Sequence, residues 1–249
     1  MINKEPTILH IETATSICSV NLSKGEEILS LRESQEDKSH ASLLTVFIKE
    51  TLESTGTDPS ELDALSLSLG PGSYTGLRIG ASVVKGMAYA LDIPVIGIHS
   101  LRALAQRCKT EVEKRRFNGN NYLICPMIDA RRMEVYSAIY DSSLKEIRKT
   151  QAEIIDQHSY SAYLDWTKVV FCGNGSDKSQ KIITHDHAVF LPEVFASSSG
   201  MVKPSLEEWE KSRFLDTAYF EPFYLKEFIA TRPKNKVLGQ ILKDKGKRV

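Results

Sequence analysis

The hydrophobic and polar positions of this 249-residue chain change from a strand-like period to a helix-like period and back again. The pattern predicts three strands joined by short polar turns, at residues 7–12, 17–22 and 28–32. Helices and strands then alternate, at residues 39–54, 64–69, 76–91, 93–98 and 100–116. Three meandering strands followed by alternating helices and strands indicate an α/β fold, with a mixed sheet and helices packed against it.

The same order of predicted strands and turns is repeated in the second half of the chain. Strands are predicted at residues 122–128, 134–140, 144–149, 169–172 and 188–191, and a helix at residues 205–213. Alignment of Glu12 with Asp129 also aligns residues 20–22 with residues 137–139, so the spacing is kept. An internal repeat of this size predicts two homologous lobes.

We therefore expect an N-terminal lobe at residues 1–118 and a C-terminal lobe at residues 119–249. Prolines interrupt the later part of the chain, at positions 192, 204, 222 and 233. They suggest that the second lobe is reduced. From residue 234 to residue 249 the chain carries six Lys or Arg against one Asp, which makes an irregular basic tail.

Residues 70–80, with the sequence GPGSYTGLRIG, lie between a predicted strand and a predicted helix. Their glycines and proline predict a tight turn, and the N-terminus of the helix leaves backbone N–H groups without partners. Such a turn could hold an anion. A plain corner between a strand and a helix explains the same residues equally well.

Composition narrows the class of protein. The 32 basic residues balance the 32 acidic ones, so the charge does not indicate a dedicated nucleic-acid binder. No apolar run approaches the ~20 residues that cross a membrane, and residues 1–6 lack the hydrophobic core of a signal peptide. The four cysteines are isolated, which is typical of reduced thiols in a core. We expect a cytoplasmic protein with no membrane contact.

Motifs of several enzyme classes are absent. There is no Gly-Lys-Ser/Thr phosphate loop, no dinucleotide spacing and no Gly-x-Ser-x-Gly nucleophile elbow. No cysteine pair has the spacing of a zinc site. On the first predicted helix, His40 is followed one turn later by Leu44, so the histidine pair that would clamp a metal is broken. We expect no catalytic residues and no metal site.

Two acidic residues stand at equivalent places in the repeat. Glu12 ends the first strand of the first lobe, and Asp129 ends that of the second. In a two-lobed nucleotide enzyme such carboxylates orient a metal-bound phosphate or a water. The candidate phosphate residues are therefore Glu12, Thr13, Thr15, Ser16 and Asp129. A turn-forming carboxylate is the alternative, and the arginines after Asp129 are too bulky for a phosphate hairpin.

Several segments together resemble one bacterial family, TsaB (also called YeaZ), a subunit for biosynthesis of threonylcarbamoyladenosine in tRNA and a paralogue of TsaD. The similar segments are residues 8–15, 70–80, 94–101, 128–136 and 221–225. The match is good over roughly the first 140 residues and loose afterwards. Glu12 stands where many relatives have Asp, which weakens an inherited phosphate site.

The resemblance implies a two-lobed actin/Hsp70-like ATPase (ASKHA) fold and a non-catalytic scaffold. Such a subunit pairs with TsaD and, with the ATPase TsaE, serves the threonylcarbamoylation of adenosine 37 in ANN-decoding tRNAs. It implies no cofactor of this chain's own, because the partner complex handles ATP and Mg²⁺. It also implies contact with tRNA through the complex, and a homodimer when the partner is absent.

The resemblance places the partner contact on the helices at residues 39–54 and 76–91. The expected interface residues are Ala41, Leu44, Phe47, Ile48, Gly76, Gly80, Val83, Val84 and Met87. Apolar positions on these helices extend beyond one face, which favours an outward contact. The alternative is that both stripes face the sheet.

Two other functions remain open on the sequence. The chain could be a stand-alone nucleotide-binding hydrolase that uses Glu12 and Asp129. It could also bind tRNA directly through its basic tail. The first would bind ATP tightly by itself, and the second would lose RNA affinity without the tail.

Overall fold

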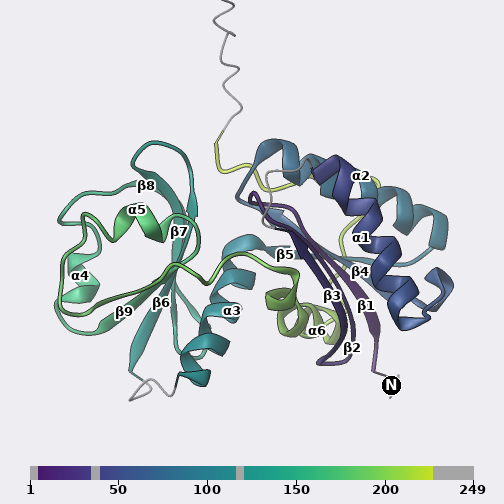
Figure 1. Ribbon diagram of the computed structural model, residues 1–249, viewed down its shortest axis with the longest axis horizontal. Helices are drawn as coiled ribbons and strands as arrows, with labels where there is room; N and C mark the ends of the chain where they lie inside the picture. Colours follow the sequence, from purple (N-terminus) through teal and green to yellow (C-terminus); the bar gives the residue numbers. More distant parts are fainter. Residues whose placement is uncertain (1–4, 35–39, 116–120, 227–249) are drawn as a thin grey trace, which may run out of the picture.

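The computed structural model describes residues 5–34, 40–115 and 121–226, and its strands form two sheets that belong to two lobes (Figure 1). The strands of the first sheet are β1 (Thr7–Glu12), β2 (Cys18–Lys24), β3 (Glu27–Ser34), β4 (Ala64–Gly70) and β5 (Val95–His99). Those of the second are β6 (Tyr122–Asp129), β7 (Glu134–Asp141), β8 (Glu146–Ile154), β9 (Lys168–Cys172) and β10 (Ala188–Leu191).

Both sheets have the same topology. The first has the order β3-β2-β1-β4-β5, and the second, read in the same direction, has the order β8-β7-β6-β9-β10. In each, three antiparallel strands meander and two further strands join in parallel. This duplication confirms the repeat that the sequence predicted and the two-lobed α/β class with mixed sheets.

The helices cover the sheets unequally. Four are longer: α1 (His40–Thr55), α2 (Tyr74–Leu91), α3 (Ser100–Lys114) and α6 (Val202–Glu210). The others are single turns: α4 (Ser161–Leu164), α5 (Ser176–Ser179) and the 3₁₀ turns η1 (Pro59–Glu61) and η2 (Ser198–Met201). The predicted helix at 205–213 begins earlier, because Pro204 is accommodated in its first turn.

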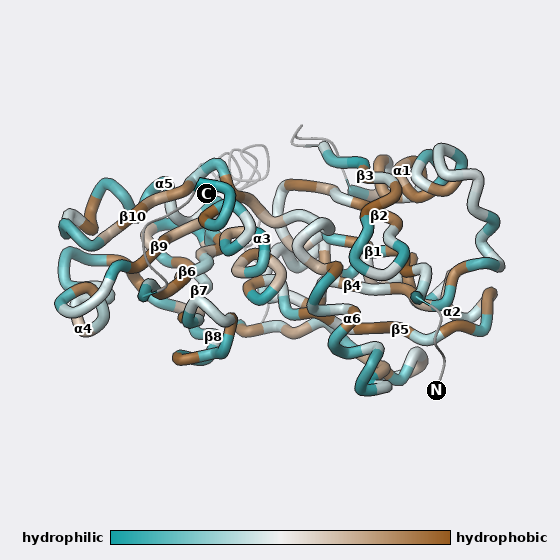
Figure 2. Tube along the Cα trace, turned by 90° about the horizontal axis from the view of Figure 1, so that it is seen from below, coloured by the Kyte–Doolittle hydropathy of each residue, from teal (hydrophilic) through white to brown (hydrophobic). Residues whose placement is uncertain are grey.

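Alternation along the strands divides the core of the first lobe into two layers. Leu9 and Ile11 of β1 pack with α1 and α2, whereas Ile8 packs on the other face, with Ala103 of α3 and Met201. In the second lobe, α3 covers one face, and the short α4 and α5 lie over the other. Figure 2 shows hydrophobic residues along the inner strands of both sheets. The second lobe is therefore reduced in its helices but keeps its strands.

After β10 the chain returns to the first lobe. The Ser198 hydroxyl lies 2.7 Å from that of Ser19 in β2, and the Ser205 hydroxyl lies 2.7 Å from that of Ser66 in β4. Leu215 pairs with Val95 at the edge of β5, and Phe220 enters the core of the first lobe. The division at residue 118 thus follows the sequence repeat, while residues 197–220 pack with the lobe that precedes it.

Within the described residues, no helix is long and apolar enough to cross a membrane.

Candidate functional site

The turn between β1 and β2 holds the first group of candidate phosphate residues. The Glu12 side chain is completely buried, and its Oε1 accepts a hydrogen bond from the Ala14 N–H at 2.6 Å. Its Oε2 has no hydrogen-bond partner within the described part of the chain. Burial raises the pKa of the Glu12 carboxyl from 4.5 to about 7, although backbone N–H groups lower it in part. Thr13 and Thr15 are buried with it, and only Ser16 is exposed.

Glycines of residues 70–80 pack directly on this turn. The Ser73 N–H donates to the Ala14 carbonyl at 2.6 Å. A Cβ atom at Gly72 would lie 2.1 Å from the Ala14 carbonyl oxygen, and one at Gly76 would lie 2.1 Å from that of Thr13. The glycines are therefore required for the close approach of α2 to the β1–β2 turn. This contact favours the plain corner over the anion site.

His40, at the start of α1, also contacts this turn. Its Nε2 lies 2.8 Å from the Thr15 carbonyl oxygen, which accepts a hydrogen bond from the ring. One turn further along α1, Leu44 is fully buried in the core. Within the described residues, no three His, Cys, Asp or Glu side chains are grouped so that they could hold a metal ion.

The equivalent turn between β6 and β7 is filled in a different way. Asp129 is exposed, and its Oδ1 accepts from the Arg131 N–H at 2.8 Å. Lys178 of α5 forms an ion pair with Asp129 and donates to the carbonyls of Arg132 and Glu134 at 2.8 and 2.7 Å. A cation of the protein therefore occupies this turn.

The surroundings of the two carboxylates differ. Glu12 faces the interior of the first lobe, whereas Asp129 is tied to Lys178 at the surface of the second. Asp129 is also fixed from the backbone, since its N–H donates to Asn174 Oδ1 at 3.0 Å. Asp129 is thus engaged with the protein, whereas Glu12 is engaged through Oε1 and its Oε2 is left without a partner in the described part of the chain.

Several expected interface residues lie inside the subunit. Leu44, Ile48 and Val84 are buried in the core of the first lobe, and Gly76 and Gly80 are buried against the β1–β2 turn. These five positions are therefore covered within the subunit, and the assignment of the partner contact to α1 and α2 stays a prediction. Ala41 is exposed, while Phe47, Val83 and Met87 are half-buried at the edge of the core.

The exposed apolar positions on these helices are different ones. Val46 of α1 is 45% exposed and Tyr89 of α2 is 88% exposed. A groove of about 520 Å³ lies between α1, the loop that follows it and α2. Its lining residues are Thr45, Ile48, Lys49, Leu52, Glu53, Gly56, Thr57, Asp58, Pro59 and Met87. The apolar pattern of the sequence did not identify Val46, because Val46 lies between the buried positions Leu44 and Ile48 and outside the apolar stripe that they form.

A family model described as "TsaD: tRNA N6-adenosine threonylcarbamoyltransferase" matches residues 28–212. The tRNA threonylcarbamoyladenosine biosynthesis protein TsaB of Escherichia coli (strain K12) is 28% identical over 236 residues, which are 90% of this chain and 96% of that protein. TsaB of Bacillus subtilis (strain 168) is 33% identical over 134 residues, or 54% of this chain and 55% of that protein.

Two solved structures share the fold over most of the chain. YeaZ from Pseudomonas aeruginosa superposes with a TM-score of 0.74 at 24% identity, and covers 88% of this chain and 100% of its own. A second P. aeruginosa structure, of an uncharacterized protein with similarity to peptidase YeaZ, gives 0.76 at 24% identity, with 89% and 100% covered. The chain belongs to the family that the TsaD model describes and, within it, to the TsaB/YeaZ group.

Proposed function

We propose that this chain takes part in the biosynthesis of threonylcarbamoyladenosine in tRNA, as a non-catalytic subunit that pairs with a TsaD subunit. The observation that carries the proposal is membership of the TsaB/YeaZ group, whose curated relatives are named for this pathway. The ATPase TsaE is the third component, and the modified base is adenosine 37 of ANN-decoding tRNAs. The tRNA is contacted through the complex.

The two filled turns support a scaffold without chemistry of its own. A nucleotide enzyme needs open backbone N–H groups and free carboxylates near the phosphates. Here α2 packs on the β1–β2 turn, and Lys178 occupies the β6–β7 turn. ATP and Mg²⁺ then bind elsewhere in the complex, and this chain needs no cofactor.

The outer surface of α1 and α2 is the proposed contact with the partner. α1 carries the exposed Val46, α2 carries the exposed Tyr89 and the half-buried Met87, and a groove lies between the two helices. Exposed apolar side chains beside an apolar groove are typical of an association site. Without the partner, two copies of the chain would use the same surface for a homodimer.

Reconstitution tests the function. TsaD and TsaE from the same organism would be supplied with tRNA, ATP and the threonylcarbamoyl-adenylate donor, with and without this chain. We expect threonylcarbamoyladenosine only when the chain is present, and none from the chain alone. A full rate of modification without the chain would refute the proposal.

The interface is tested by Val46→Glu combined with Tyr89→Glu. Both side chains are exposed, so the subunit should still fold, while carboxylates buried in an apolar contact would abolish pairing. Light scattering of the mixture with TsaD measures the mass of the complex. Ile154→Glu is the matched control, because Ile154 is an exposed apolar residue of β8 in the other lobe. A mixed dimer that survives the double change would place the contact elsewhere. Its loss in the Ile154→Glu control would do the same.

The hydrolase alternative has its own test. Tight binding of ATP by the isolated chain, measured by calorimetry and lost in Glu12→Ala, would favour it over the scaffold. The direct tRNA binder depends on residues 234–249, which lie outside the described residues.

A further inference from the structure

Residues 221–226, which no role proposed above uses, run from the first lobe to the second. The Phe223 N–H donates to the Leu69 carbonyl of β4 at 2.7 Å. The Phe223 ring meets the ring of His99 at 5.2 Å, edge to face. This end of the segment is therefore held by the carboxyl ends of β4 and β5.

The first lobe provides further contacts to this segment. A Cβ atom at Gly70 would lie 2.7 Å from the Phe223 carbonyl oxygen, so the glycine lets the segment lie against the end of β4. The Tyr224 ring lies against that of Tyr74 of α2, with centroids 5.0 Å apart and planes tilted by 41°. Just upstream, Lys85 of α2 donates to a backbone carbonyl at residue 218 and lies 4.6 Å from the ring of Phe220.

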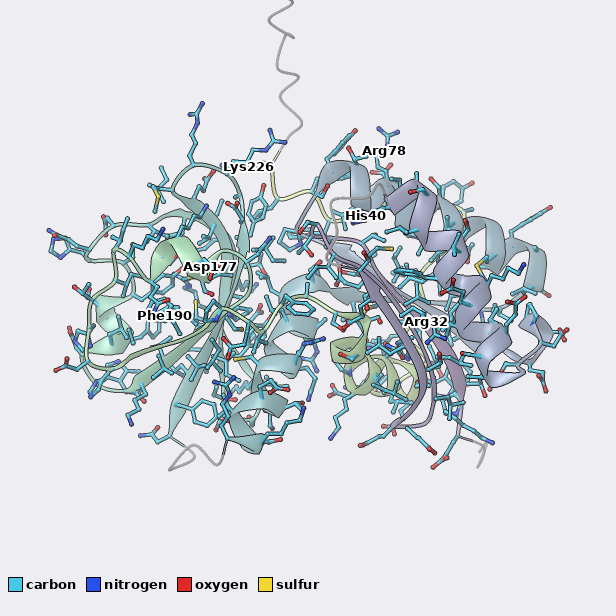
Figure 3. All side chains as sticks on the ribbon, in the orientation of Figure 1. Arg32, His40, Arg78, Asp177, Phe190 and Lys226 are labelled. Atoms are coloured by element: carbon cyan, nitrogen blue, oxygen red, sulfur yellow. The ribbon has the colours of Figure 1, made fainter. Side chains whose placement is uncertain are left out.

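The contact with the second lobe is of another kind. Lys226 pairs with both carboxylate oxygens of Glu134, the first residue of β7. The Lys226 side chain is 47% exposed and that of Glu134 is 22% exposed. Figure 3 shows Lys226 between the two lobes. An ion pair that reaches solvent is weak and is screened by salt.

The two lobes are also connected through α3, which contributes side chains to the cores of both lobes. Ala103 belongs to the layer beneath the first sheet, while Leu104 and Cys108 belong to the core of the second lobe. Figure 1 shows α3 between the two sheets, with the segment at residues 221–226 crossing the junction away from it. The lobes are thus joined by a buried helix and by a surface segment.

We propose that residues 221–226 form a strap between the lobes, fastened by a latch, the Lys226–Glu134 ion pair, that opens and closes. Backbone and ring contacts keep the strap on the first lobe. The latch is electrostatic and solvent-accessible, so it opens more readily than the backbone and ring contacts that hold the strap on the first lobe. Once it opens, the second lobe gains freedom to turn relative to the first about α3.

A carbodiimide cross-linking experiment tests the closed strap. The reagent activates a carboxylate and joins it to a neighbouring amine as an amide, with loss of water to the reagent. We expect a linked peptide that contains Glu134 and Lys226, and its yield should fall as sodium chloride is raised. The Asp129–Lys178 pair within the second lobe is the internal control. If that control link forms and the Glu134–Lys226 link does not, the strap is refuted.

Spin-label distances test the release. Labels would be placed at Tyr89→Cys and Ile154→Cys, both exposed and in different lobes, while the four native cysteines are buried. We expect a broader distance distribution after Lys226→Gln or Glu134→Gln. The control is Lys203→Gln, which removes an exposed ion pair with Glu26 inside the first lobe. An unchanged width in both latch variants would overturn the proposal. Neither readout depends on tRNA modification.

Discussion

Glu12 and His10 are two titratable residues of β1 that are completely buried, and burial shifts their pKa values in opposite directions. It raises the pKa of the Glu12 carboxyl to about 7 and lowers the pKa of the His10 ring from 6.5 to about 3. The His10 ring is placed by hydroxyls, with Nε2 2.9 Å from that of Ser23 and Nδ1 3.3 Å from that of Ser205. A neutral His10 therefore belongs to the contact between β1 and α6.

These shifts make opposite contributions to the pH dependence of stability. Between pH 4.5 and 7 the folded chain keeps a proton on Glu12 that the unfolded chain has lost, so this contribution falls as the pH rises. Between pH 3 and 6.5 the unfolded chain binds a proton on His10 that the folded chain lacks, so that contribution rises with pH. A single variant is needed to separate them.

Glu12→Gln isolates the carboxylate. The amide keeps an oxygen to accept from Ala14 and carries no charge, so the variant should gain about 3 kcal/mol relative to the unchanged chain between pH 4.5 and 8. Urea unfolding at several pH values measures the difference. A variant with the same relative stability at every pH would contradict the shifted pKa.

The glycines of α2 differ in what surrounds them on each side of the helix. Gly76 and Gly80 face the β1–β2 turn, and a Cβ atom at Gly80 would lie 2.5 Å from Thr13 Oγ1. Gly86, on the same helix, has no atom within 4 Å of such a position in the described structure. Glycines that are alike in sequence thus have different roles, and only those at the turn are required by contact.

Replacement of these glycines by alanine tests that difference. Gly76→Ala should destabilise the fold by about 3 kcal/mol, because the methyl group would overlap the Thr13 carbonyl. Gly86→Ala, the matched control, should stabilise it by about 0.5–1 kcal/mol, since alanine favours the helix and meets no neighbour. Thermal unfolding measures both. Equal effects would show that α2 does not pack on the turn as described.

At the scale of the whole molecule, the first lobe is completed by a segment from the end of the chain. Glu33 of β3 accepts from the Ser19 hydroxyl at 3.0 Å and from Arg107 of α3 at 3.4 Å, and it also bonds to Ser197. Phe220 then closes the core beneath α2. A part-buried polar cluster around Glu33 and the buried Phe220 side chain thus join residues far apart in sequence.

Truncation tests whether the first half folds alone. Residues 1–118 would expose the face of the first sheet that η2 and α6 cover, including Ile8 and Ile96. We expect no cooperative unfolding transition from this fragment, and a cooperative one from residues 1–226. Circular dichroism during heating distinguishes the two. A two-state transition in the shorter fragment would show that the sequence repeat is also a folding boundary.

Much of the fold was accessible from local pattern. β1 was predicted with the bounds that the structure has, and α2 within two residues of its N-terminus, because a period of 2 or 3.6 is visible in a short window. The single turns α4 and α5 were missed, since four residues are too few to show a helical period. Glu12 and Asp129 were chosen as candidate site residues because they occupy equivalent positions in the repeat, and the sequence did not show which groups contact them.

The sequence by itself determined the order of the strands, their duplication and the resemblance to the TsaB/YeaZ group, because each depends on neighbouring residues or on a repeated spacing. The bounds of β8 were not determined in this way, since the strand predicted at 144–149 runs from Glu146 to Ile154. Tertiary structure decided the burial of Glu12, the occupation of the β6–β7 turn by Lys178, and the return of residues 197–220 to the first lobe. The hydroxyls of Ser19 and Ser198 lie together although 179 positions separate them. Such contacts depend on how whole elements pack, and no local period records them.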